Sequence, residues 1–241
     1  MNAIQFTCND LVLNGYLHMP ENQTKPPVVI GSHGLFSSGD SLKQIAIANA
    51  CNENGIAYFR FDHRGCGKSQ GKFEEVTTLE NRKNDLLAAV ETICSRQDIG
   101  KRFGLFGSSM GGACCLAASH VLKSQYEHFR AMVVLAAPLT SDTLKKASTQ
   151  TSVDERITPE FFQHNLQFDL RHLLADLSHI LIMHGDNDRV VLPENAHELY
   201  EVVQHPKKLV VFPNGDHVIS NSEHQEQLLA ETVQWFKTYL L

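Results

Sequence analysis

The segment Gly107-Ser108-Ser109-Met110-Gly111 has the strongest chemical signal in the chain. It fits the pattern Gly-x-Ser-x-Gly, which places a serine on a sharp turn between a strand and a helix so that its hydroxyl is exposed. The apolar run 102–106 before the motif predicts the strand, and the stretch 109–122, rich in small residues, predicts the helix. The pattern alone is weak evidence, but this position between two elements makes Ser109 a candidate nucleophile.

A serine hydroxyl is a poor nucleophile at neutral pH, so it needs a base within hydrogen-bond reach and a third group that orients this base. Of the 13 histidines, His217 is the best candidate, because it follows the predicted strand 208–212 and a turn. The orienting acid would be Asp186 or Asp188, since both follow the predicted strand 180–183. Either aspartate could instead be a turn residue that bonds its own backbone.

The elements that must position these residues follow from the hydrophobic pattern. Short apolar segments predict eight strands, at 4–8, 11–19, 28–30, 56–61, 102–106, 131–136, 180–183 and 208–212. Helical spacing predicts helices at 41–54, 79–94, 109–122, 194–203 and 223–240. The first two strands form an antiparallel hairpin at Asn9-Asp10, and strands then alternate with helices. This is typical of an α/β fold with a mostly parallel sheet covered by helices on both faces.

Ligands of such sheets bind at the carboxyl ends of the strands, and all the candidate residues follow strands. One long segment, 139–178, interrupts the alternation and is too small to have its own core. We expect a single domain over residues 1–241, with 139–178 as a small lid over the carboxyl edge; the alternative is a surface insertion without a role. A helix start at Thr158-Pro159-Glu160 makes Phe161 and Phe162 candidates for contact with a substrate.

Composition and charge restrict the partner. Hydrophobic residues make up 42% and charged residues 20%, as in an ordinary globular protein and unlike a disordered chain. A net charge of −6 argues against a nucleic-acid partner, so we expect a small-molecule ester substrate. No zinc-protease or dinucleotide-binding motif is found, so neither a metal nor an organic cofactor is expected. The sequence leaves the oligomeric state, monomer or homodimer, open.

The cysteines and the apolar segments bear on location. The six cysteines include no CxxC pair, and free, mostly buried thiols are typical of a reducing compartment. The N-terminal residues lack the features of a secretory signal. No apolar run approaches the roughly 20 residues of a membrane span. We therefore expect a cytoplasmic protein without a membrane span.

Four motifs in order resemble those of the α/β-hydrolase superfamily, and the resemblance covers nearly the whole chain. Besides the serine motif, they are an oxyanion loop (Gly31-Ser32-His33-Gly34-Leu35), a D-x-R-G-x-G-x-S turn (61–69) and a G-x-x-D segment (184–191). The resemblance implies the α/β-hydrolase fold and favours Asp188, the final aspartate of its segment, as the acid. It also implies an oxyanion hole formed by the backbone N–H groups of Leu35 and Met110. Asp62 and Arg64 are expected to be structural supports of their turn.

Within the superfamily, Arg60-Phe61-Asp62 together with Gly71-Lys72-Phe73-Glu74 is similar to bacterial cinnamoyl/feruloyl esterases and to serine aminopeptidase-like (S33-type) hydrolases. Those esterases have a larger insertion where this chain has 139–178, so the resemblance leaves the substrate open.

The resemblance implies a serine hydrolase of carboxylic esters with small apolar or aromatic groups. Ser109 would attack, His217 would take and return the proton, and Asp188 would hold the imidazole in place. An amidase or peptidase with the same triad is the alternative, and it would need a carboxylate for a substrate amino group. The acidic residues that could supply it are Asp154, Glu155 and Glu160. A non-catalytic binding protein on this scaffold is disfavoured, since a binder has no need of all three triad residues.

Overall fold

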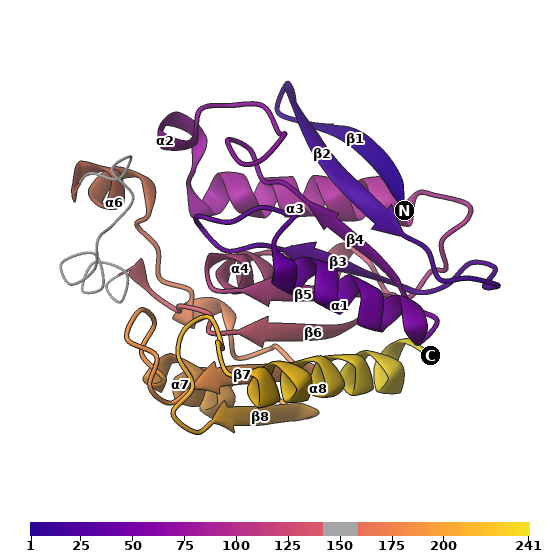
Figure 1. The fold of residues 1–241 in the computed structure, drawn as a ribbon. Helices are drawn as coiled ribbons and strands as arrows, with labels where there is room; N and C mark the ends of the chain where they lie inside the picture. Colours follow the sequence, from indigo (N-terminus) through magenta and orange to yellow (C-terminus); the bar gives the residue numbers. More distant parts are fainter. Residues whose placement is uncertain (142–158) are drawn as a thin grey trace.

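The computed structural model describes residues 1–141 and 159–241, which form an eight-stranded mixed sheet (Figure 1). The strands are β1 (Asn2–Cys8), β2 (Leu11–His18), β3 (Val28–Ser32), β4 (Ala57–Phe61), β5 (Phe103–Ser108), β6 (Phe129–Leu135), β7 (Ile180–Gly185) and β8 (Lys207–Phe212). Their order is β1-β2-β4-β3-β5-β6-β7-β8. β1 and β2 are antiparallel to each other, as are β2 and β4, and all other neighbours are parallel. The predicted fold class is therefore confirmed.

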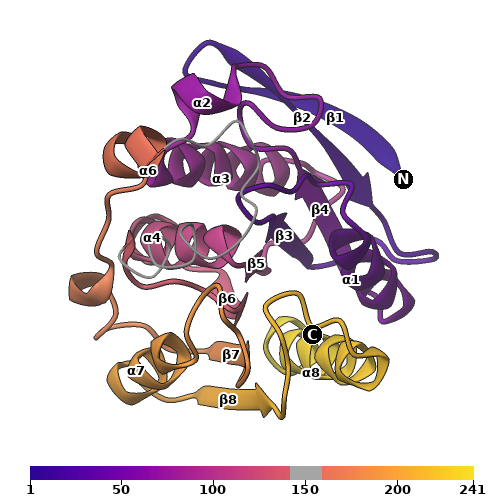
Figure 2. The ribbon, with the colours of Figure 1, turned by 60° about the vertical axis from the view of Figure 1, so that its left-hand side comes forward.

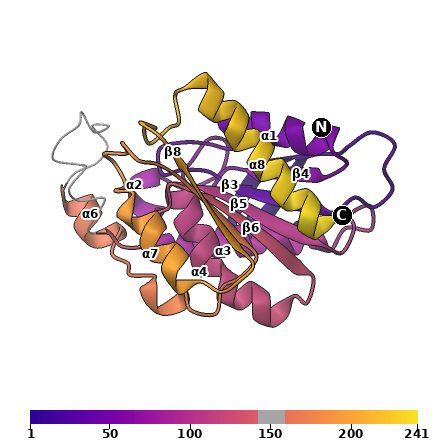
Figure 3. The same cartoon turned by 90° about the horizontal axis from the view of Figure 1, so that it is seen from below.

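Helices cover both faces of this sheet. They are α1 (Leu42–Glu53), α2 (Phe73–Val76), α3 (Leu79–Cys94), α4 (Met110–Gln125), α6 (Pro159–Asn165), α7 (Glu194–Val202) and α8 (Ser222–Leu240), with a 3-10 turn η1 (Arg171–Leu173). Figure 2 shows α3, α4 and α7 on one face, and α1 and α8 on the other. In Figure 3, α8 runs across its face of the sheet beside α1.

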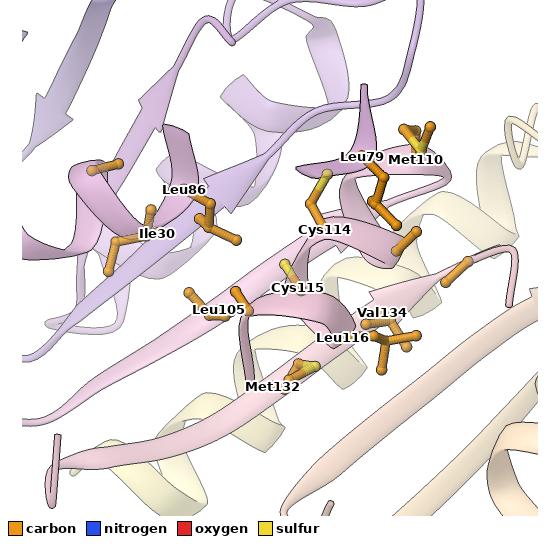
Figure 4. Packing of buried hydrophobic residues seen from close by; sticks show 14 of the residues in the cluster. Ile30, Leu79, Leu86, Leu105, Met110, Cys114, Cys115, Leu116, Met132 and Val134 are labelled. Carbon is orange, nitrogen blue, oxygen red and sulfur yellow. The ribbon is translucent and has the colours of Figure 1, made fainter. Parts of the chain in front are cut away.

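Burial on both faces explains why the central strands are apolar throughout. In β6, Met132 and Val134 belong to the core beneath α3 and α4, whereas Val133 and Leu135 belong to the core beneath α1 and α8. Successive side chains of a strand point to opposite faces, so both sets must be apolar. Figure 4 shows part of the first core, including Leu116 of α4 with Val134 and Met132.

Local signals determine where several elements begin and turn. Ser41 and Thr78 are the N-caps of α1 and α3, and their side chains accept hydrogen bonds from backbone N–H groups of the first turn. Asn221 caps α8 in the same way. Asn9 and Asp10 join β1 to β2 with φ values of 49° and 64°, the left-handed conformation that a two-residue hairpin turn requires.

The observed elements differ from the predicted ones mainly at their ends. The helix predicted at 109–122 covers Met110–Gln125, and the strand predicted at 131–136 covers Phe129–Leu135. In the strand, exposed Arg130 breaks the apolar pattern although its backbone continues the strand. The short α2 and η1 were not predicted, because segments of four and three residues are too short to show helical periodicity.

The described part of segment 139–178 includes α6 and η1. Figure 1 places α6 beyond the carboxyl ends of the central strands. Asn165 of α6 donates from Nδ2 to the Glu74 carbonyl oxygen of α2 at 2.9 Å. The ring of Phe161 stacks on that of Phe73, with centroids 5.6 Å apart. These contacts attach α6 to α2.

Within the described ranges, no helix has the length and apolar character to cross a bilayer. All six cysteines are unpaired, and five of them are buried. Asp154 and Glu155, which the sequence suggests as possible substrate contacts, lie outside the described residues.

Candidate active site

Ser109 stands on a sharp turn between β5 and α4, with backbone angles φ 55° and ψ −125°. A positive φ is unfavourable for a residue with a Cβ and persists only where the surroundings fix it. Here the Ser109 N–H donates to the Leu135 carbonyl at 2.8 Å, and the Ser109 carbonyl accepts from the Gly112 N–H at 2.8 Å. The neighbouring strand and the new helix thus hold the serine backbone from both sides.

The two glycines of the motif are needed for close backbone packing. A Cβ added at Gly107 would lie 2.3 Å from the Gly111 carbonyl oxygen, and one added at Gly111 would lie 2.1 Å from the Ser32 carbonyl oxygen. Any side chain at either position would force the backbone apart. The end of β3 and the start of α4 can therefore touch only because these residues are glycines.

The structure brings together the three side chains that the sequence suggests. His217 Nε2 lies 3.0 Å from Ser109 Oγ, and His217 Nδ1 lies 2.7 Å from Asp188 Oδ2. A carboxylate only accepts, so Nδ1 carries the proton and Nε2 is left to accept from the serine hydroxyl. This is the tautomer that a base for Ser109 requires.

Asp188 is buried and accepts hydrogen bonds on both oxygens. Its Oδ1 accepts from the N–H groups of Val190 and Val191 at 2.8 and 2.9 Å. Its Oδ2 lies 3.2 Å from His184 Nε2, in addition to its contact with His217. Burial acts to raise the pKa of Asp188, but the hydrogen bonds from His184 and His217 outweigh it and hold this pKa well below the usual range. The carboxylate is therefore ionised at neutral pH.

Asp186 and Asp188, which the residue pattern left as alternatives, have different environments. Asp186 is exposed, and its backbone N–H donates to the Phe212 carbonyl. Asp188 is buried against His217. Only Asp188 is placed to orient the imidazole.

His184 was not singled out by sequence reasoning, although it lies in β7 only four residues before Asp188. Its Nε2 donates to the Val191 carbonyl at 2.8 Å and also approaches Asp188 Oδ2. Its Nδ1 is buried and has no hydrogen-bond partner among the described residues. His184 and His217 thus approach the same oxygen of Asp188, and His184 helps to hold this carboxylate in place.

The loop that carries Leu35 passes directly beside the serine. A Cβ added at Gly34 would lie 3.7 Å from Ser109 Cβ. Within the described residues, neither the Leu35 N–H nor the Met110 N–H donates to another protein group. Met110 is the first residue of α4, where a helix leaves its N–H groups without a partner. Both donors are available at the position where an oxyanion hole would form.

His33 fixes the conformation of this loop. Its Nε2 accepts from the His63 N–H at 3.1 Å, and its Nδ1 lies 2.7 Å from the Gly34 carbonyl oxygen. Because Nε2 must accept, Nδ1 carries the single proton and donates to Gly34. Burial, together with the nearby Arg82, lowers the pKa of His33 well below its usual value, so the ring is neutral.

Asp62 and Arg64 contact their own turn and neighbouring segments. Asp62 accepts from the N–H groups of Gly39 and Lys68 at 2.7 and 2.8 Å. Arg64 donates from Nε to the buried Asp85 at 2.8 Å. Both side chains support the loops around the site.

Phe161 and Phe162 are buried in the core, where their rings meet edge to face at 5.8 Å. Phe161 stacks on Phe73, whose ring centroid lies 5.8 Å from that of Phe36, the residue after Leu35. A cavity of about 370 Å³ adjoins this row of rings. It is lined by Leu35, Phe36, Ser37, Ser38, Ser41, Gly65, Cys66, Gly67 and Phe73. It therefore begins at the loop proposed to bind the oxyanion.

Lys43, in the first turn of α1, is a further charged group near the site, and no sequence pattern indicates it. Burial lowers its pKa to about 8, against the opposing influence of Asp216 and Asp188. Among the described residues, no cluster of three or more His, Cys, Asp or Glu side chains could hold a metal ion.

Comparison with known proteins relates the chain to a family of hydrolases. A family model described as serine aminopeptidase, S33, matches residues 23–179. The uncharacterised protein YfhR of Escherichia coli O157:H7 is 27% identical over 206 residues, which cover 84% of this chain and 67% of that protein. The chain thus matches about two thirds of the length of this relative.

Solved structures show the same fold. Est1E from Butyrivibrio proteoclasticus, with ferulic acid bound, superposes with a TM-score of 0.81 at 23% identity over 98% of both chains. The esterase PF2001 of Pyrococcus furiosus gives a TM-score of 0.81 at 22% identity, covering 100% of this chain and 91% of that one. At these identities the likeness concerns the fold.

Partial burial of the Lys43 ammonium predicts a pH-dependent stability. Its pKa of about 8 in the folded protein lies below the ordinary value of 10.5, so the unfolded chain binds this proton more strongly. The unfavourable charge burial is present in full below about pH 8 and is relieved as the pH rises toward about 10.5. Lys43→Met should raise the free energy of unfolding at pH 7 by about 1 kcal/mol, and this gain should shrink over that window.

Urea unfolding of both proteins at pH 7, 9 and 10 measures the effect. Lys101→Met, which removes an exposed ammonium, is the matched control and should change little at any pH. An equal gain for Lys43→Met at pH 7 and pH 10 would contradict the prediction.

Proposed function

Since the chain belongs to the serine aminopeptidase S33 family, with residues 23–179 matching its model, we propose that it is a serine hydrolase of carboxylic esters that forms an acyl-enzyme. The family and the α/β-hydrolase fold support hydrolase activity. The observation that supports the serine mechanism most directly is the chain of hydrogen bonds from Ser109 through His217 to Asp188. A hydroxyl in this arrangement can transfer its proton to the imidazole as it attacks a carbonyl carbon.

In the proposed acylation, Ser109 Oγ bonds to the ester carbonyl carbon while His217 Nε2 takes the hydroxyl proton. The imidazolium that forms is stabilised by the buried, ionised Asp188. Collapse of the tetrahedral intermediate breaks the bond to the alcohol oxygen, which leaves with the proton from His217. In deacylation a water molecule gives a proton to His217 and attacks the acyl carbon. Collapse of the second tetrahedral intermediate breaks the bond between the acyl carbon and Ser109 Oγ, which takes the proton back from His217 as the acid is released.

The carbonyl oxygen gains negative charge in each tetrahedral intermediate. We assign the N–H groups of Leu35 and Met110 to this oxygen, because neither donates to another group of the described residues. Met110 directly follows Ser109, and Gly34, which precedes Leu35, lies beside it. Fixed donors of this kind contribute strongly, since loss of one costs about 10²–10³ in rate. The dense packing of the loop against α4 keeps them in place before substrate arrives.

The surroundings favour a small apolar or aromatic group in the ester. The cavity beside Leu35 has two phenylalanine rings and three serine hydroxyls in its lining. Binding sites for small molecules commonly combine apolar walls with a few polar groups. Est1E, which shares the fold, has been solved with ferulic acid bound, which supports an aromatic acid as one possibility. We include Phe161 and Phe162 as the second row of rings that supports this wall.

An amidase or peptidase would use the same three side chains, and the description of the family model is the observation that favours this alternative. It would need a carboxylate to hold the amino group of a substrate. In the described part of segment 139–178, Glu160 is exposed at the start of α6. We rank the ester first because the cavity lining is aromatic and hydroxylic.

The proposal includes a small-molecule partner, a lid role for segment 139–178 and a cytoplasmic location.

Replacement of the nucleophile is the direct test. Ser109→Ala should lower kcat on p-nitrophenyl butyrate by at least about 10³-fold, because no other group can form the acyl-enzyme. Ser108→Ala, which removes the adjacent hydroxyl of the same motif, should keep kcat within a few-fold of wild type. Near-equal turnover by the Ser109→Ala variant would refute the assignment.

A second pair of variants separates the two aspartates. Asp188→Asn should lower kcat by about 10⁴-fold, because an amide can donate to His217 Nδ1 and so favour the wrong tautomer. Asp186→Asn removes an exposed carboxylate near the same loop and should leave kcat close to wild type. Steady-state kinetics on the same ester measures both, and equal losses in the two variants would argue that the loop as a whole, and not Asp188, is required.

A substrate panel separates esterase from peptidase activity. Acetyl, butyryl and feruloyl esters should be hydrolysed with higher kcat/KM than an octanoyl ester or aminoacyl p-nitroanilides, because the cavity is small and partly aromatic. A preference for the anilides would favour the peptidase alternative. Hydrolysis of none of them, with unlabelled Ser109 after fluorophosphonate treatment, would favour a binding protein.

A further inference from the structure

A single arginine of α3 binds the loop proposed to form half of the oxyanion hole. Arg82 is completely buried. Its Nη2 donates to the carbonyl oxygens of His33 and Gly34 at 2.7 and 3.1 Å. Its Nη1 approaches the Leu35 carbonyl oxygen at 3.4 Å. One guanidinium therefore contacts three consecutive carbonyls of the loop.

The charge of Arg82 has no carboxylate partner in the described part of the chain. Asp85, a buried carboxylate of the same helix, is bound instead by Arg64 at 2.7 Å and by His63 at 3.4 Å. Arg82 also contacts the thiols of Cys66 and Cys114, which are poor acceptors. Its Nε is buried and has no hydrogen-bond partner among the residues that the structure describes.

A buried charge without a counterion lowers the stability of the folded protein, and the unsatisfied Nε of Arg82 lowers it further. A neutral amide could bind a carbonyl at lower cost, so hydrogen bonding alone does not account for an arginine here. A positive charge beside the loop can, however, stabilise negative charge that develops on the other side of the same peptide. That is where the substrate oxyanion would form.

The Gly34 carbonyl and the Leu35 N–H belong to the same peptide group. The Gly34 oxygen accepts from Arg82 Nη2, from His33 Nδ1 at 2.7 Å and from the Ser37 N–H at 3.3 Å. Donors at the oxygen draw electron density from the peptide nitrogen, and hydrogen-bonded chains strengthen one another in this way. The Leu35 N–H thereby becomes a stronger donor.

His33 and Arg82 act on the Gly34 oxygen together. Their nitrogens, His33 Nδ1 and Arg82 Nη2, lie 3.4 Å apart. Since His33 Nε2 accepts from the His63 N–H, His33 Nδ1 is protonated. His33 Nδ1 and Arg82 Nη2 are therefore two donors that lie close together because both donate to the Gly34 oxygen. The loop peptide is fixed by a charged donor and a neutral one at the same atom.

We propose that Arg82 is a positioning residue of the hydrolysis, which fixes and polarises the Gly34–Leu35 peptide so that the Leu35 N–H binds the oxyanion. The inference rests on the proposed function. Arg82 lies behind the peptide and does not touch the substrate. Its charge is constant over the working pH range, because guanidinium does not lose its proton in proteins.

This role predicts an effect on the transition state and not on the ground state. Full negative charge appears on the carbonyl oxygen only as the tetrahedral intermediate forms, so a polarised donor lowers the barrier more than it tightens substrate binding. Loss of Arg82 should then lower kcat with little change in KM. A purely structural role would lower the melting temperature and the fraction of active molecules, but not kcat per active site.

The test uses Arg82→Gln and Arg82→Lys in the full chain, with Arg64→Lys as the matched control. Arg64 is a similarly buried arginine of the same region that binds Asp85 and not the loop carbonyls. Active sites are counted by fluorophosphonate labelling. Then kcat and KM for p-nitrophenyl butyrate are measured, together with Ki for a trifluoromethyl ketone, which forms a tetrahedral anion on the serine.

Arg82→Gln should lower kcat per active site by about 10–10²-fold. The Leu35 N–H is weakened but not removed, so the loss should be smaller than the roughly 10²–10³ for a whole oxyanion donor. KM should stay within about twofold, and Ki should rise by the same factor as kcat/KM falls. Arg82→Lys keeps the positive charge but has fewer fixed donors, so its kcat per active site should fall less than that of Arg82→Gln. Arg64→Lys should lose stability but keep kcat per active site and Ki.

The proposal is overturned if kcat per active site is unchanged, if the loss appears in KM alone, or if Ki does not change with kcat/KM. It is also overturned if neither Arg82 variant folds, because the guanidinium would then serve stability. Failure of the proposed function is separate: it would appear as a wild-type protein that hydrolyses no ester and is not labelled at Ser109.

Discussion

The close contact between the end of β3 and the start of α4 is the constraint on which the site depends. The Gly111 backbone packs so near the Ser32 carbonyl that a methyl group at that position would lie 2.1 Å from its oxygen. Beside this contact, backbone hydrogen bonds to Leu135 and Gly112 hold Ser109 at a positive φ, a conformation that costs of order 1–3 kcal/mol and is maintained by its surroundings. The contact also brings the loop after β3 alongside the serine. This packing contact therefore places Ser109 beside the loop whose Leu35 N–H we propose as an oxyanion donor.

Two buried charges of opposite sign contact the groups around Ser109. Asp188, buried and ionised, stands behind His217. Arg82, buried and cationic, stands behind the Gly34–Leu35 peptide. In the proposed mechanism, attack by the serine would create an imidazolium next to the aspartate and an oxyanion at the peptide that the arginine binds. Fixed charges of this kind need no reorganisation during the reaction, which is why preorganised electrostatics contributes so much to catalysis.

The sequence contains the local signals for much of this arrangement. Gly-x-Ser-x-Gly and its neighbours predict the turn at Ser109, and the alternation of strands and helices predicts that residues after the strands meet at one edge. The residue types could not separate Asp188 from Asp186, because that choice depends on which carboxylate the backbone turns toward His217. Arg82 and Lys43 were missed for a related reason. Each lies on a helix with no local motif, and its environment arises from segments distant in the chain.

In the proposed function, the parts of the molecule that select the substrate differ from the parts that carry out the reaction. In the described residues, α6 is linked to the site through stacked rings, from Phe161 to Phe73 and then to Phe36. Phe36 directly follows Leu35, so a change of packing under α6 would reach the loop that we propose to bind the oxyanion. A rigid sheet can thus keep one chemistry while segments joined to its edge change the substrate. This explains how Est1E and this chain can share a fold at 23% identity without that likeness determining a common substrate.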